Sequence, residues 1–139
     1  MKNVTREELE SLQIQLQREA DVVESMVRAE SDCLARLRHS FLHAQFMELL
    51  AMKKSRMEEL AQLREGMKPL ADRWVVERRE TNASHVGVEA QLERIRAAFE
   101  MLRTVEADLE QLASDYLRKL TQGSGTVQDR IALYRSWGG

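Results

Sequence analysis

The chain has 139 residues, enough for one domain with a modest core, and its charged residues (32%) balance to a net charge of −2. A surface so balanced exerts no long-range attraction on DNA, RNA or anionic lipid, which argues against nucleic-acid or phosphate-binding roles. Aromatic residues are scarce (5%) and proline occurs once, a composition typical of a solvated all-α protein.

The first predicted helix spans residues 6–38. Thr5 and Glu8 have the spacing of a capping box, which satisfies amides at a helix start. Polar positions at Glu19 and Glu30 weaken the apolar seam that follows. The seam consists of Leu9, Leu12, Leu16, Val23, Val27, Leu34, Leu37 and Phe41. Local rules allow one helix as far as residue 65, or a turn at the polar His39-Ser40 step with Ser40 capping a second helix.

The second predicted helix spans residues 41–65. It is apolar on more than one side, as expected of a helix that is central in a bundle or that awaits a partner. Its methionines more often fill gaps in a core than adapt to partners. The sequence from Glu65 through Gly66 to Pro69 predicts the helix end, because glycine favours the position after a helix and proline cannot continue one.

The third predicted helix spans residues 70–120 and contains the clearest seam in the chain. Residues 77–87 have little to bury and form either an exposed stretch of continuous helix or a local kink at Gly87; we favour continuity, because no turn dipeptide interrupts them. From Val88 the apolar residues recur at alternating steps of three and four, which predicts packing along the whole length. The seam consists of Val88, Leu92, Ile95, Phe99, Leu102, Val105, Leu109, Leu112, Tyr116 and Leu120.

Two units are predicted: a helical bundle over residues 1–122 and a linker with an amphipathic tail over residues 123–139. Gly123-Ser124-Gly125 is flexible by composition. A short amphipathic helix is expected near residues 127–136, and a helix this short must dock on something to be stable. The fold class is therefore all-α, an antiparallel bundle or coiled-coil-like hairpin of long helices with a short C-terminal helix.

Catalytic, cofactor-binding and metal-binding residues are not expected. His39 and His43 have the i,i+4 spacing of a metal pair, but no third ligand lies in register. Cys33 lacks a catalytic partner nearby in sequence and is expected to be a small packing residue. With these residues given no catalytic role, we expect a non-enzymatic protein. The N-terminus lacks the apolar region of a signal peptide and no stretch is long enough to span a membrane, so we also expect the protein to be cytoplasmic.

The pattern resembles the FlgN-like flagellar export chaperones. Glu30 with Leu34 resembles that family's Glu-x-x-x-Leu in the first helix, and Lys53 or Lys54 stands where the family has a lysine before a leucine-rich run. Asn82 precedes a long amphipathic helix, and Tyr134 with Gly138 resembles a C-terminal Tyr…Gly signature. The resemblance also favours the turn at His39-Ser40.

The resemblance implies a cytoplasmic chaperone that binds hook–filament junction proteins, shields their terminal amphipathic helices and delivers them to the flagellar type III export apparatus. An apolar groove can cover such helices by helix-in-groove binding. One alternative is a stalk-like protein associated with the export ATPase. Another is a coiled-coil scaffold that dimerises through the seam of residues 88–120. Whether the free protein is a homodimer is left open.

Partner-binding residues are expected at the end of the third helix and in the tail. A third helix longer than the first two should overhang the bundle at its C-terminal end, where its apolar row would meet a client. The tail could fold back over this row or clamp the client; alternatively, it completes the core or is disordered. The predicted residues are Leu109, Leu112, Tyr116, Leu117, Leu120, Ile131, Leu133, Tyr134 and Trp137.

Overall fold

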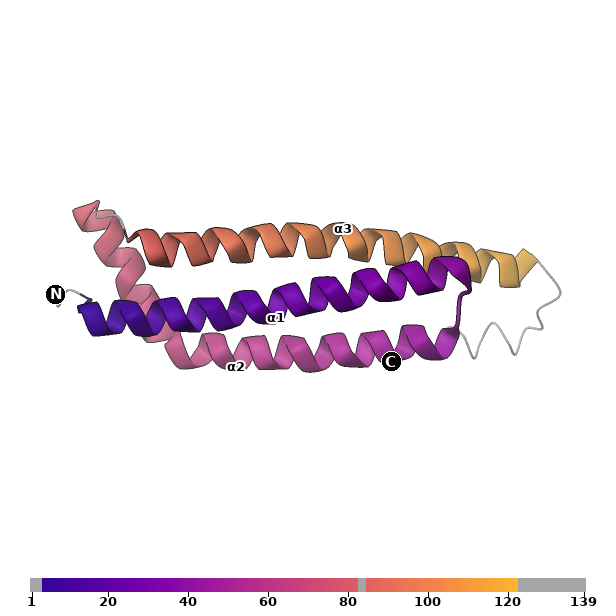
Figure 1. Ribbon diagram of the computed structural model, residues 1–139, viewed down its shortest axis with the longest axis horizontal. Coiled ribbons are helices and arrows are strands. Elements are labelled where there is room, and N and C mark those ends of the chain that lie inside the picture. The colour runs from indigo at the N-terminus through magenta and orange to yellow at the C-terminus, as the bar shows by residue number, and fades with distance from the viewer. Residues whose placement is uncertain (1–3, 83–84, 123–139) are drawn as a thin grey trace.

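The computed structural model describes residues 4–82 and 85–122, and these residues form an all-α bundle of three helices. The helices are α1 (Arg6–His39), α2 (His43–Thr81) and α3 (Val86–Gln122). Helix α1 lies between the other two; α3 runs in the same direction as α1, and the first part of α2 runs antiparallel to both (Figure 1). No β-strand occurs in the described ranges. The predicted helix at 127–136 and the linker before it lie outside these ranges.

Helix α1 begins and ends as the sequence predicts. The hydroxyl of Thr5 accepts a hydrogen bond from the Glu8 amide, and the Glu8 carboxylate accepts one from the Thr5 amide, so the capping box is confirmed. The turn after His39 is confirmed too. Ser40, however, is the extended C-cap of α1, and α2 begins after Leu42 without a side-chain cap, so the predicted capping role of Ser40 is wrong.

Helix α2 does not end at Gly66, so the boundary predicted there is wrong. It continues through Gly66 and Pro69 to Thr81, because Gly66 does not adopt a left-handed conformation and the chain simply bends. Proline at position 69 removes the amide that would bond the Glu65 carbonyl, and this loss bends a helix without always ending it. Beyond the bend, residues 70–81 cross the end of the bundle (Figure 1); we call this segment the α2 arm.

The predicted continuity from residue 70 to residue 120 is also wrong. Asn82 ends α2 with φ 54° and ψ 25°, and its amide donates a hydrogen bond to the Arg78 carbonyl. Asparagine tolerates this left-handed conformation better than most residues, so it can terminate a helix as glycine does. Helix α3 then starts at Val86 and includes the whole predicted seam.

The core lies along α1, not along the second helix. Three apolar clusters follow one another down the bundle, and each combines residues of α1 with residues of both other helices. Ala20, Val23 and Met26 of α1 are fully buried. Helix α2 contributes few buried residues, namely Phe46, Leu49, Leu60 and Trp74. Among the described residues, no helix combines the length and apolar character needed to cross a bilayer.

Replacing Gly66 with alanine should raise the free energy of unfolding by about 0.5–1 kcal/mol. Gly66 is helical and exposed, and a Cβ atom there would meet nothing within 4 Å. The methyl group would therefore restrict the unfolded chain without a clash. Urea denaturation of the parent and the variant measures the change. A destabilised variant would show that the bend depends on the conformational freedom of glycine.

Candidate functional site

The C-terminal end of α3 carries the predicted client-binding row. Leu109 is 5% exposed and belongs to the core cluster nearest the α1–α2 turn, and Leu112 packs against that cluster. The ring of Tyr116 stacks on Phe41, with centroids 4.1 Å apart and planes at 22°. The first part of the row, from Leu109 to Tyr116, therefore packs against the bundle, although Leu112 and Tyr116 keep part of their surface exposed.

Leu117 and Leu120 complete the row and remain half-exposed. Helix α3 extends past the turn between α1 and α2 (Figure 1), so the predicted overhang is present. The helix lengths from which the overhang was predicted were wrong. Apolar side chains on such an overhang have neighbours on one side only, so a partner helix could cover them. The predicted tail residues Ile131, Leu133, Tyr134 and Trp137 lie outside the described residues.

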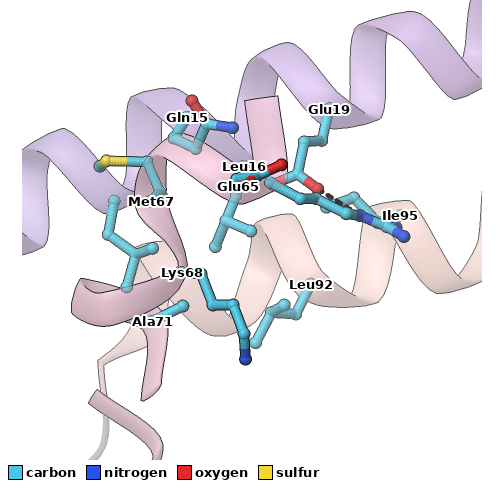
Figure 2. Close-up of a pocket in the computed structure, with 11 residues that line it drawn as sticks. Gln15, Leu16, Glu19, Glu65, Met67, Lys68, Ala71, Leu92 and Ile95 are labelled. Carbon is cyan, nitrogen blue, oxygen red and sulfur yellow. Dashed lines mark hydrogen bonds and ion pairs between the residues drawn. The ribbon is translucent and has the colours of Figure 1, made fainter. Parts of the chain in front are cut away.

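A second apolar surface lies where α2 bends to cross the end of the bundle. The bend leaves a groove of about 440 Å³ between α1, α2 and α3. Figure 2 shows side chains of all three helices around it, with Lys68 and Leu92 on opposite helices. The Arg64 guanidinium donates to the Glu19 carboxylate at 2.8 Å beside the groove. The apolar residues among those lining the groove are Leu12, Leu16, Met67, Ala71, Leu92 and Ile95.

A polar cluster inside the bundle was missed in the sequence. Glu30 of α1 is 2% exposed, and its Oε2 atom has no hydrogen-bond partner among the described residues. Beside it, the Lys53 ammonium of α2 donates to the Glu106 carboxylate of α3 at 2.6 Å. Burial, the largest cause, and the negative charge of Glu106 both raise the pKa of Glu30, and Lys53 lowers it; together they bring this pKa to about 7. We call these three residues the buried carboxylate cluster.

The sequence did contain a signal for this cluster. Glu30 falls in phase with Val23, Val27, Leu34 and Leu37, so it occupies a seam position and must be buried if the seam packs. The resemblance used both Glu30 and Lys53, and the structure places these two residues beside the same small hollow.

The sequence singled out His39, His43 and Cys33 as residues that could bind a metal or act as a nucleophile. In the part of the chain described here, no group of three or more His, Cys, Asp or Glu side chains is arranged to hold a metal ion. Cys33 is buried, as predicted, and burial raises the pKa of its thiol. A buried thiol with a raised pKa is a poor nucleophile, because the reactive species is the thiolate.

Comparisons with known proteins add no relative: no protein-family model, curated protein or solved structure matches this chain.

Proposed function

We propose that this protein is a cytoplasmic export chaperone of the FlgN-like kind. It binds the terminal amphipathic helices of hook–filament junction proteins and delivers them to the flagellar type III export apparatus. The observation that carries the proposal is the half-exposed apolar row at the overhanging end of α3, formed by Leu112, Tyr116, Leu117 and Leu120. A helix laid along this row would bury it by helix-in-groove binding.

The scaffold alternative receives less support from the packing. A coiled-coil dimer through the α3 seam would need that seam free, yet Val88, Ile95 and Leu102 are each at most 8% exposed within the single chain. These residues pack in the same clusters as buried residues of α1. Dimerisation through them would require α1 to leave the bundle, which would expose the buried apolar residues of α1 to water.

Substituting both Leu117 and Leu120 with aspartate should weaken client binding about tenfold or more, because central apolar anchors carry most of the energy of a helix interface. Calorimetry would measure the affinity for a peptide covering the terminal amphipathic helix of a hook–filament junction protein. These two positions are preferred over Leu112 and Tyr116, whose side chains also hold the bundle together. Circular dichroism would check that the variant keeps its helicity.

Met101→Asp is the matched control, since Met101 lies on the same helix, is 59% exposed and is remote from the overhang. It should bind the peptide as the parent does. Equal affinity of the parent and the double variant would contradict the assigned surface, and Leu92→Asp would then test the groove in Figure 2. A parent that does not bind such peptides would overturn the chaperone proposal itself.

A further inference from the structure

The surroundings of Glu30 are unusual for a carboxyl group. Its side chain faces a hollow of about 80 Å³ that opens between all three helices. Most of the nearby wall is apolar, so an ionised Glu30 would lose its hydration without gaining a hydrogen bond at Oε2. The apolar residues of that wall are Phe46, Leu49, Leu50 and Leu109.

Each helix places charged or titratable groups around the hollow. Helix α2 contributes Lys53, and α3 contributes Glu106 and Glu110; on α1 itself, the thiol of Cys33 interacts electrostatically with Glu30. Lys53 is already paired with Glu106, and their side chains are 32% and 26% exposed. An ionised Glu30 would therefore place a second carboxylate near Lys53, whose ammonium group is already paired with the carboxylate of Glu106.

Helix α2 is the helix whose movement could most easily give an ionised Glu30 access to water or to Lys53. Before its bend it buries only Phe46, Leu49 and Leu60, whereas α1 has buried residues along most of its length. A helix held by few buried side chains opens at a lower free energy than the rest of the fold. Movement of the first part of α2, residues 43–65, would admit water to Glu30 and let Lys53 reach either carboxylate.

We propose that Glu30 is a proton-sensitive latch, which holds the first part of α2 against α1 and α3 when its carboxyl group is neutral and loosens α2 when it ionises. The pKa of Glu30 in the closed bundle, about 7, lies above the ordinary value of 4.5. A raised pKa means that the closed form binds the proton more tightly than the open form. Closure is therefore favoured most below about pH 4.5, and this advantage disappears as the pH rises through about 7.

Hydrogen exchange of the backbone amides at about pH 5.5 and about pH 8.5 tests the latch. Protection factors, which correct for the pH dependence of chemical exchange, should fall roughly tenfold or more for residues 46–60 of α2 at the higher pH, since one pKa unit corresponds to a factor of ten. Amides of α3 near Val88 should change much less. Equal loss throughout the bundle, or no loss in α2, would overturn the proposal.

Glu30→Gln should keep α2 protected at both pH values, because an amide cannot ionise. The variant differs from the parent at this one side chain, so the comparison isolates Glu30. Glu19→Gln is the matched control: Glu19 is the other buried glutamate of α1, but it is paired with Arg64. The control should keep the parent's pH response, and a Glu30→Gln variant that also kept it would contradict the latch.

Two further variants keep the test decisive should Glu30→Gln fold poorly. Glu106→Gln removes the negative charge beside Glu30 and should move the midpoint of the α2 transition to lower pH. Lys53→Met removes the positive charge and should move it to higher pH. Opposite shifts are expected of an electrostatic latch and not of a general loss of packing, so midpoints that stay in place or move together would overturn it.

Discussion

Replacing Trp74 with alanine should lower the free energy of unfolding by about 3–5 kcal/mol, the usual cost of deleting a buried aromatic ring. Trp74 lies on the α2 arm, is 4% exposed and packs in one cluster with Leu12 and Val88. Its indole Nε1 donates to Nδ1 of His85 at 2.8 Å, and the Arg78 guanidinium lies 5.4 Å from the ring centroid. Urea denaturation followed by circular dichroism would measure the loss.

Two controls separate the contributions of the ring. Trp74→Phe keeps most of the apolar area but removes the donor to His85, so it should cost less than the alanine variant. Val75→Ala, at the next position on the arm, should change stability by no more than about 0.5 kcal/mol because surface substitutions rarely do more; Val75 is 39% exposed. A loss below about 1 kcal/mol for Trp74→Ala would show that the arm is not docked on the bundle in solution.

The α2 arm also shows where sequence rules stop. A glycine followed by a proline predicts a helix end, and local propensity supports that interpretation. The arm stays helical because its contacts with the bundle outweigh the one backbone bond that Pro69 removes. The amide of Val4 donates to Glu77 at 2.9 Å, and Arg73 donates to Glu8 at 2.7 Å. These partners are more than sixty residues apart in sequence, so no local pattern could predict them.

Helix α1 could be predicted almost to the residue, whereas for α3 only the seam and the C-terminal end could be, because the predicted helix began at residue 70 and not at Val86. The Thr5–Glu8 capping box sets the start of α1, and the seam from Val88 to Leu120 sets the extent of α3. Helix α2 has no comparable seam, since its buried residues Phe46, Leu49, Leu60 and Trp74 are widely spaced and the bend divides them. The end of α2 depends on the left-handed conformation of Asn82, which asparagine tolerates but which its presence in the sequence does not by itself predict.

The candidate sites divide in a similar way. The apolar row on α3 followed from periodicity within one helix, so its members could be identified before the fold was known. The buried carboxylate cluster depends on how three helices are aligned, because Glu30, Lys53 and Glu106 meet only in the folded bundle. A seam position occupied by glutamate indicates burial, but it does not reveal which charges lie opposite.

The central position of α1 can be tested by replacing a buried methionine of α1 and an exposed methionine of α3 with alanine in two separate variants. Met26→Ala should lower the free energy of unfolding by about 2–5 kcal/mol, whereas Met101→Ala should change it by no more than about 0.5 kcal/mol. Both variants remove the same atoms and gain the same helix propensity, so their difference reports burial alone. Met26 is 0% exposed in a cluster with Leu60 and Leu102, while Met101 is 59% exposed. Urea denaturation of both variants at one pH would measure the difference, and equal effects would mean that α1 is not the helix around which the bundle packs.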